Sequence, residues 1–411
     1  MAKKKRPYRL LILSTVNALL MLLITFHWLR LPYTFGDEAF LIKWTALTKK
    51  SLLGIDPKPV PESVLFVDIS ESKTTLEMPN DFGEPSPYHR MVITDRTHLT
   101  EFMAMIVPYR DQTQLVVLDV ILDKASPEDS LLQEQVDLLG PKLMGVNHLE
   151  GEDQQAIPSV IDFQLQGLAT YRSAQGLFLK YPLLFQDSIP TVPLVMYEQL
   201  QHQKMDHSGL FYRFPQGISL PAPVVDFKVR SNDFHEGVNL SESNFTTFKM
   251  ADLLDMQSFM AEEDIAALFE HKIILIGDFS ADLHETPFGK TPGLLLIYNA
   301  YLTLQEQDNI VSFFWILLIF SGYWLLSWRI FNDIELKRPR WLVRLFQTKL
   351  GELILHTLDD AFLLIVLTFI SYFIFNIHIN ILILLVYAKV VEFIWEKVNP
   401  KLFPVTKNTM T

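Results

Sequence analysis

A run of 20 residues without a charged side chain, residues 10–29, constrains this 411-residue chain more than any other feature. As a helix rising 1.5 Å per residue, the run would span about 30 Å, which matches the hydrocarbon core of a bilayer. Five basic residues precede it, as they do in a signal peptide. The run is longer than the apolar region of a signal peptide, and it ends without a small-residue cleavage site. We therefore interpret it as an uncleaved membrane anchor.

Three further apolar runs lie in the last quarter of the chain. Residues 310–328 contain no charge and three tryptophans, a second run follows Asp359 and Asp360, and a third covers residues 381–395. A polar break at residues 376–380 separates the last two, which is typical of a tight helical hairpin. We therefore predict four transmembrane helices, at residues 10–29, 310–328, 359–376 and 377–395.

Charged residues are distributed unevenly between these runs and the region they enclose. Residues 31–309 hold 19 Lys and Arg against 40 Asp and Glu, a balance of −21, whereas the remaining residues hold 16 against 7, a balance of +9. An excess of Lys and Arg marks cytoplasmic segments. We therefore predict that segments 1–9, 329–358 and 396–411 are cytoplasmic and that residues 30–309 lie outside. The acidic outer region also argues against a nucleic-acid partner.

The pattern of residues 30–309 predicts an α/β domain. Continuous apolar runs at residues 64–69, 115–122 and 272–276 are typical of strands buried on both faces, which favours a parallel sheet. Helix candidates with capping or proline starts lie between them, at residues 96–106, 128–139, 193–203, 264–269 and 292–305. We expect a three-layer α/β/α domain with a mainly parallel sheet and β-rich insertions between about residues 150 and 235. The chain contains no Cys, so this domain must be held by its core alone.

Acidic strand ends and proline- or glycine-containing turns follow one another in a fixed order along this domain. They are Asp68-Ile69-Ser70 with Pro87-Tyr88-His89-Arg90, then Val117-Leu118-Asp119-Val120, then Gly277-Asp278 with Thr286-Pro287-Phe288-Gly289 and Pro292-Gly293. This set resembles the CHASE2 family of bacterial extracytoplasmic sensor domains, as does the order of one anchor, an outer domain and closely spaced spans. The resemblance implies a sensory receptor in the bacterial inner membrane, with a periplasmic or extracellular domain that takes part in signal transduction.

The resemblance also implies an output, since family members commonly continue into a cytoplasmic cyclase, kinase or phosphatase domain. Only 16 residues follow Trp395 in this sequence, and the 329–358 loop is also too short for a domain. We therefore expect a separate membrane or cytoplasmic protein, or a second copy of the chain, as the partner. The alternative is a structural subunit that scaffolds a membrane complex. A deep polar pocket would favour sensing, and a large exposed apolar patch would favour scaffolding.

Three carboxylates are expected at one edge of the predicted sheet. Asp68, Asp119 and Asp278 each sit at or near the carboxyl end of a strand, where open parallel sheets bind ligands. Together they could bind a divalent cation or a cationic or polyhydroxy ligand, or each could instead cap the turn that follows it. Arg90 could bind an anionic ligand or pair with one of these carboxylates in a structural ion pair. We take these four residues as ligand-binding candidates.

Other candidate chemistry is weaker. Asp282 and His284 are metal-ligand types, but their spacing matches no metal signature, and an exposed acidic loop is the simpler interpretation. Gly289-Lys290-Thr291 lacks the upstream glycine of a phosphate-binding loop. Because no catalytic constellation is found, we predict no cofactor, no metal and no enzymatic activity, with a metal-dependent hydrolase as a remote alternative.

Lys389 is the candidate functional residue within the predicted spans. It lies 11 residues beyond His378 at the predicted hairpin apex, about 16 Å along a helix, where a charge is costly. Alternatively, its long side chain could reach the cytoplasmic face near Glu392. By the same count, Asp360 should lie about 27 Å from the apex, at the cytoplasmic interface.

Overall fold

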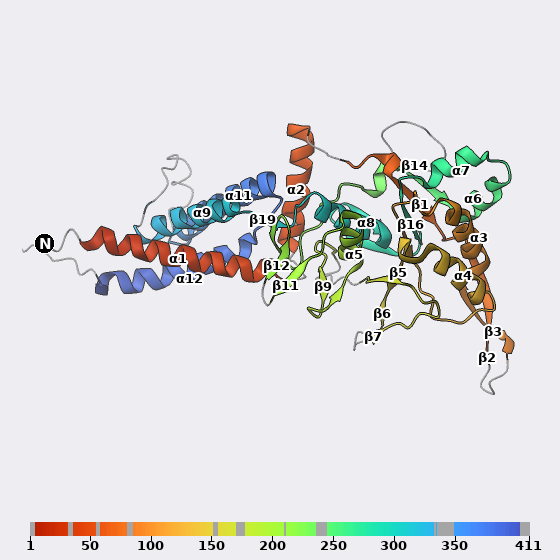
Figure 1. The fold of residues 1–411 in the computed structure, drawn as a ribbon. Helices are drawn as coiled ribbons and strands as arrows, with labels where there is room; N and C mark the ends of the chain where they lie inside the picture. Colours follow the sequence, from red (N-terminus) through yellow and green to blue (C-terminus); the bar gives the residue numbers. More distant parts are fainter. Residues whose placement is uncertain are drawn as a thin grey trace, which may run out of the picture. The chain divides into compact units, whose positions relative to one another are not determined.

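The computed structural model describes residues 5–31, 36–54, 58–79, 85–150, 155–169, 177–208, 211–235, 245–332, 334 and 349–402. The chain divides into two compact units (Figure 1). One, here called the helical unit, consists of residues 1–54, 216–224 and 308–411. The other, here called the α/β unit, consists of residues 55–215 and 225–307.

A parallel sheet forms the centre of the α/β unit. Its strand order is β15-β1-β16-β4-β5-β8, with the short β14 beside β15, and every one of these neighbours is parallel. The strands are β1 (Val64–Asp68), β4 (Leu115–Asp119), β5 (Leu143–Asn147), β8 (Leu165–Leu168), β14 (Phe234–His235), β15 (Phe245–Lys249) and β16 (Ile273–Gly277). The three strands predicted from continuous apolar runs are the central ones, β1, β16 and β4. They are buried along almost their whole length, which confirms the prediction of a mainly parallel sheet.

Helices α3 (Arg96–Ile106), α4 (Asp129–Leu139), α6 (Met250–Gln257) and α7 (Glu262–Phe269) contribute to one core. Alternate residues of the central strands, such as Leu65 and Val67, join Phe102 and Phe269 in this core. Residues of the opposite strand face contact other helices, because successive strand side chains point to opposite faces. There the ring of Phe66 lies 5.6 Å from that of Tyr298 in α8 (Gly293–Gln305).

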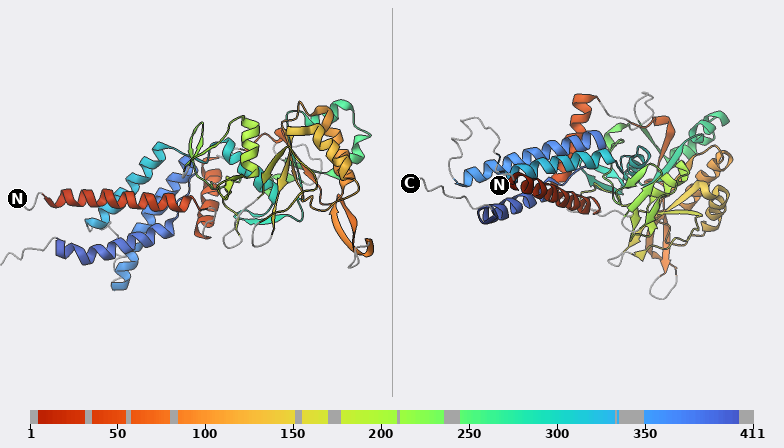
Figure 2. Two further views of the ribbon diagram at one scale, coloured as in Figure 1. Left: turned by 60° about the horizontal axis from the view of Figure 1, so that its bottom comes forward. Right: turned by 60° about the vertical axis from the view of Figure 1, so that its left-hand side comes forward.

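Short antiparallel pairs and one further helix, α5 (Val192–Gln201), complete this unit. The pairs are β2 (Lys73–Pro79) with β3 (Pro85–Thr94), β6 (Leu149–Glu150) with β7 (Gln155–Ala156), β9 (Leu184–Phe185) with β10 (Ile189–Pro190), β11 (Asp206–Ser208) with β12 (Phe211–Phe214), and β17 (Leu283–Thr286) with β18 (Gly289–Pro292). The β2-β3 hairpin extends away from the sheet (Figure 2). Several of the pairs fall between residues 150 and 235, where β-rich insertions were predicted.

The helical unit contains α1 (Lys5–Leu29), α2 (Gly36–Leu53), α9 (Phe313–Phe331), α11 (Lys349–Phe375) and α12 (Ile381–Leu402), with a small pair of strands, β13 (Gly217–Ser219) and β19 (Ile310–Val311). Within the described residues, three helical segments are long and apolar enough to cross a membrane, and they lie in α1, α9 and α11. The expectation of four spans is therefore wrong. The helix α12 packs in the same apolar core, but Lys389, Glu392, Glu396 and Lys397 give it too many charges for a candidate span.

Polar side chains fix the helices of this unit to one another. Asn17 donates to the hydroxyl of Ser327 at 2.8 Å, which joins α1 to α9. Trp315 donates through its indole N–H to the hydroxyl of Ser371 at 2.7 Å, which joins α9 to α11. The ring of Phe26 lies 5.7 Å from that of Trp315, so the end of α1 lies beside the start of α9. Neighbouring helices therefore run antiparallel, as in an up-and-down bundle.

Candidate ligand site at the carboxyl edge of the sheet

The three central strands end side by side. In the strand register, Asp68 of β1 is paired with Gly277 of β16, and Gly277 is paired with Asp119 of β4. Asp278 follows directly, so the three predicted carboxylates lie at one edge of the sheet, here called the carboxyl edge. This arrangement follows from the parallel strands, which all end on the same side.

Asp68 holds together the two loops that leave this edge. Its side chain accepts hydrogen bonds from the backbone N–H of Ser70 at 2.9 Å, the hydroxyl of Ser70 at 2.7 Å and the backbone N–H of Phe279 at 3.1 Å. Both carboxylate oxygens therefore have donors within the protein, and the residue is only 9% exposed. These contacts are those of a loop-capping carboxylate, one of the two roles that the sequence leaves open.

A cavity of about 710 Å³ lies beside Asp68. It is formed by the loops that follow β1 and β16, by β15, and by the adjacent face of α6. Its charged and polar lining includes Asp68, Glu71, Lys249, Asp252 and Ser280, and its apolar lining includes Phe234, Phe248, Phe279 and Leu295. The volume is in the range of small-molecule sites.

The charges around this cavity favour a cationic occupant. Three carboxylates, from Asp68, Glu71 and Asp252, face a single cation, Lys249. The Lys249 ammonium lies 2.5 Å from Glu71, and this partner raises the pKa of the lysine. With Lys249 and Glu71 paired, the lining keeps a negative balance, and the phenylalanine rings offer a surface that attracts cations.

Asp278 caps the loop after β16. It accepts hydrogen bonds from the backbone N–H groups of Ser280 at 3.0 Å and Ala281 at 2.8 Å, and Lys73 lies 3.1 Å from its other oxygen. Burial alone would raise the pKa of this carboxyl, but the bonds from Ala281, Lys73 and Ser280 outweigh burial and hold the pKa below its usual range.

Asp119 contacts His148, which was not among the site residues predicted from the sequence. One carboxylate oxygen of Asp119 lies 3.0 Å from Nε2 of His148, and the Asp119 side chain is only 5% exposed. Burial opposes the charged form of His148, but the contact with Asp119 outweighs it and raises the pKa of the imidazole. His148 follows β5 directly and so lies at the same carboxyl edge. A search of the residues just after each strand would have found it.

Asp282 and His284 form a second pair beside the first. Nε2 of His284 lies 2.8 Å from a carboxylate oxygen of Asp282. Burial, and then the negative charge of Asp119, raise the pKa of Asp282 to about 6, although His148 opposes this shift. Burial lowers the pKa of His284. These four residues are here called the Asp-His cluster.

The loop that carries Asp282 packs tightly against the start of α8. A β-carbon placed on Gly293 would lie 2.0 Å from a carboxylate oxygen of Asp282. A side chain at the first residue of this helix would therefore have to displace the carboxylate of Asp282. Among the described residues, no group of three or more acidic or histidine side chains is arranged to hold a metal ion.

Arg90 lies elsewhere. It is on β3 of the hairpin, opposite Glu77 of β2, with 3.5 Å between Nη2 of the arginine and the carboxylate. Both side chains are about half exposed. Arg90 therefore pairs within its own hairpin, and the structure does not bring it together with the three carboxylates.

In the helical unit, Lys389 belongs to a network of charges that joins three helices. Its ammonium lies 2.7 Å from Asp360 of α11 and 2.6 Å from Glu392 of α12. Arg329 of α9 lies 3.0 Å from Asp360 and 3.3 Å from Asp359. These five residues are here called the membrane charge network. Asp360 accepts from two cations and is only 3% exposed.

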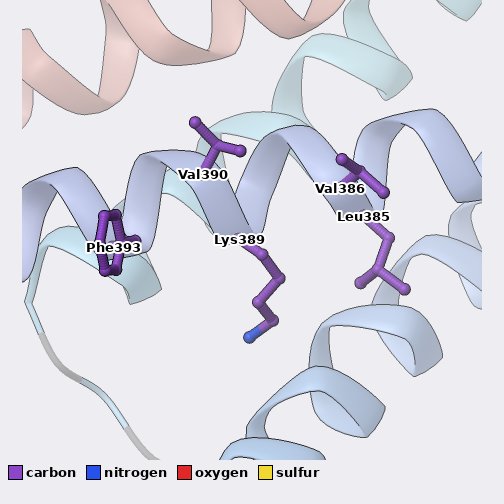
Figure 3. A pocket seen from close by; sticks show the side chains of 5 residues that line it. All are labelled: Leu385, Val386, Lys389, Val390 and Phe393. Carbon is purple, nitrogen blue, oxygen red and sulfur yellow. The ribbon is translucent and has the colours of Figure 1, made fainter.

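Figure 3 shows Lys389 with its neighbours on α12. Its side chain extends away from Val390, toward the neighbouring helix. Leu385, Val386, Val390 and Phe393 line a hollow of about 390 Å³ with it. The lysine therefore contacts Glu392 on its own helix and Asp360 on another helix.

The segment between α11 and α12 is not an exposed turn. The structure buries Ile377, His378, Ile379 and Asn380, and the hydroxyl of Ser371 donates to the carbonyl of Ile377 at 2.5 Å. The depths of Asp360 and Lys389 in a bilayer stay predictions.

A parallel α/β unit joined in sequence to apolar helices at both ends indicates a membrane-associated protein. The family model of the CHASE2 domain matches residues 15–331, which is the bulk of the chain. The chain belongs to the CHASE2 domain family, whose domain is an extracytoplasmic sensor. The match ends at the last residue of α9, so α11 and α12 lie outside it. No curated protein and no solved structure was found to match the chain.

Proposed function

We propose that this protein is a membrane sensor whose α/β unit binds a small ligand in the cavity beside Asp68. The observation that carries this proposal is the cavity itself, which lies at the carboxyl edge of a parallel sheet in a CHASE2 domain. Its acidic and aromatic lining favours a ligand with an ammonium group, and Ser280 and Thr246 add hydroxyls for a polyhydroxy portion. The residues proposed to contact this ligand are Asp68 and Asp252.

The proposed route of the signal follows the chain. Pro292 and Leu295 line the cavity and belong to the start of α8. The helix α8 ends at Gln305 and is followed after a short connection by α9, which begins at Phe313. A ligand that shifts the start of α8 would therefore pull on α9 through a short covalent link. In the helical unit, α9 carries Arg329, which ties it to α11, and Lys389 ties α11 to α12.

The proposed topology places the α/β unit, as a three-layer α/β/α domain, in the periplasm of a bacterial cell. In it α1, α9 and α11 cross the inner membrane, and α12 packs beside α11. The Lys and Arg residues before α1 and between α9 and α11 support this orientation. The segment between Phe331 and Lys349 is too short for a folded domain, so we place the output in a separate protein.

The polar cavity supports sensing over scaffolding, and it supports binding rather than catalysis. The hydroxyl of Ser70 donates to the carboxylate of Asp68 in this lining, and we assign this pair to the loop cap rather than to catalysis, because both oxygens of Asp68 already accept hydrogen bonds within the protein. The proposal is therefore a non-catalytic receptor.

The test is ligand-dependent thermal unfolding of the full chain in nanodiscs, against a panel of ammonium-bearing and polyhydroxy compounds. A ligand at 100 times its Kd should raise Tm by about 5–10 °C. Asp252→Asn should remove most of this shift because Asp252 lines the cavity. Asp255→Asn, with the same change of charge on the same helix but outside the lining, is the matched control.

The proposal fails if the panel stabilises the Asp252→Asn and Asp255→Asn variants equally, because the cavity would then not hold the ligand. It also fails if binding is lost in both variants to the same degree, because the effect would then come from overall charge.

A further inference from the structure

The helix α2 exposes a stripe of large apolar side chains. Phe40, Trp44 and Leu47 are 63%, 54% and 38% exposed, and their spacing of four and three residues places them on one side of the helix. The rings of Phe40 and Trp44 lie 6.1 Å apart. These three residues are here called the α2 stripe. A group of large exposed apolar side chains marks a surface that contacts a protein or a membrane.

The other side of α2 is packed against the helical unit. Ala39, Ile42 and Thr45 are buried, and α2 contacts both α11 and α12. The ammonium of Lys49 donates to the side-chain carbonyl of Asn376 at 3.0 Å. Asn376 directly follows the last residue of α11, so this bond fixes α2 at the end of the apolar helices.

The orientation of α2 differs from that of its neighbours. In Figures 1 and 2, α2 runs crosswise to α1, α9, α11 and α12. A helix that crosses the ends of membrane-spanning helices lies along the plane of the membrane surface. Exposed apolar residues continue nearby on the bundle, at Ile374 near the end of α11 and at Leu382 near the start of α12. The α2 stripe is therefore continuous with a surface that lipid covers.

We propose that α2 is an interfacial helix and that the α2 stripe inserts into the outer leaflet of the bilayer. Tryptophan and phenylalanine are favoured at the boundary between head groups and acyl chains. The exposed Lys43 lies next to Trp44, and its long side chain can reach lipid phosphates while the rings stay buried. This inference does not depend on what the cavity of the α/β unit binds.

The chain contains no Cys, so a single introduced Cys can be labelled without background. Leu47→Cys leaves both rings of the α2 stripe in place, and Trp44→Cys replaces one. Each variant is labelled with the fluorophore NBD and reconstituted in vesicles of phosphatidylcholine and phosphatidylglycerol. Some of the lipids carry a nitroxide either near the head group or at the end of the acyl chain. Glu134→Cys, at an exposed position of α4 in the α/β unit, is the control.

Labels at positions 44 and 47 should be quenched at least twofold more by the shallow nitroxide than by the deep one, and little by aqueous iodide. The label at position 134 should be quenched by iodide only. Iodide quenching at positions 44 and 47 without lipid quenching would overturn the inference, because the stripe would face water. Disulfide-linked dimers of both variants without lipid quenching would also overturn it, because a second copy would then cover the stripe.

Discussion

The two units both bury carboxylates, but they satisfy them differently. At the carboxyl edge, Asp68 and Asp278 accept hydrogen bonds from backbone N–H groups of their own loops and of one neighbouring loop. In the helical unit, Asp360 is satisfied by two cations from two other helices. The first arrangement shapes a loop, whereas the second connects helices that are distant in the sequence.

This difference determines what a substitution leaves behind. When a loop-capping carboxylate is removed, the orphaned partners are neutral N–H groups, some of which water can reach. When Asp360 is removed, the affected partners are two cations inside a helical bundle, each of which keeps one carboxylate, Asp359 for Arg329 and Glu392 for Lys389. Losing part of the compensation of a buried charge costs more than losing the acceptor of a neutral group. The comparison therefore predicts a larger loss of stability in the helical unit than at the sheet edge.

The largest effect is expected for Asp360→Asn. This change keeps the size of the side chain but leaves Arg329 without its 3.0 Å partner and Lys389 without its 2.7 Å partner. The free energy of unfolding should fall by about 3 kcal/mol, the lower end of the cost of breaking a buried pair, because Asp359 and Glu392 still pair with the two cations. Unfolding of the reconstituted protein, followed by steric trapping or by denaturant, measures this.

Glu392→Gln provides the matched control for Asp360→Asn. It removes the other partner of Lys389 but lies at a more exposed position, so its cost should stay near 1 kcal/mol or below. Equal costs for the two variants would mean that Asp360 does not connect the three helices energetically.

The membrane charge network also marks the limit of what residue counting can predict. The sequence identified Lys389 as unusual because a charge in an apolar run is rare, and the structure gives it charged partners. The sequence did not predict Asp360 as its partner. The segment between α11 and α12 is buried at residues 377–380, and no pattern in these residues indicates this.

The parallel sheet, in contrast, could be predicted from the sequence. Continuous apolar runs identify buried parallel strands, and parallel strands must end at one edge, so Asp68, Asp119 and Asp278 could be placed together before the structure was known. His148 was missed because its strand, β5, has a weaker apolar pattern, and because its partner Asp119 lies on another strand. The helix α2 was missed because Lys43 and Lys49 interrupt its apolar residues.

An intermediate effect is expected for Asp68→Ala. It leaves the backbone N–H groups of Ser70 and Phe279 without an acceptor at a largely buried position, which should cost about 2 kcal/mol. Denaturant unfolding of the α/β unit within the full chain measures this.

Asp68→Asn is the milder comparison, because its amide oxygen can still accept from both N–H groups. It should recover more than half of the loss. A fully stable Asp68→Ala variant would contradict the capping role and leave ligand contact as the reason for this carboxylate.

The smallest effect is a pH dependence from the Asp-His cluster. Because the pKa of Asp282 is about 6 in the folded protein and 3.8 in its ordinary state, the folded chain binds this proton more tightly than the unfolded chain. Its contribution therefore lowers the free energy of unfolding as the pH rises from about 4 to about 6. His148, whose pKa is raised, acts in the same direction: its stabilising contribution is present below pH 6.5 and is lost as the pH rises through its folded pKa. His284, whose pKa is lowered, acts in the opposite direction.

Asp282→Asn isolates the contribution of one member of the cluster. The Tm difference between Asp282→Asn and the wild type should be near zero at pH 3.5, because Asp282 is largely protonated there in both the folded and the unfolded chain. It should be positive at pH 7, because the variant avoids a charge beside Asp119. Thermal unfolding at both pH values, with Asp278→Asn as a control of opposite sign, measures this. The pKa of Asp278 is lowered, so its neutralisation should reduce Tm at pH 7.

A Tm difference for Asp282→Asn that does not change between the two pH values would mean that Asp282 titrates as an ordinary surface carboxylate. The raised proton affinity of the carboxyl edge would then be absent, and the contrast between the two units would rest on Asp360 alone.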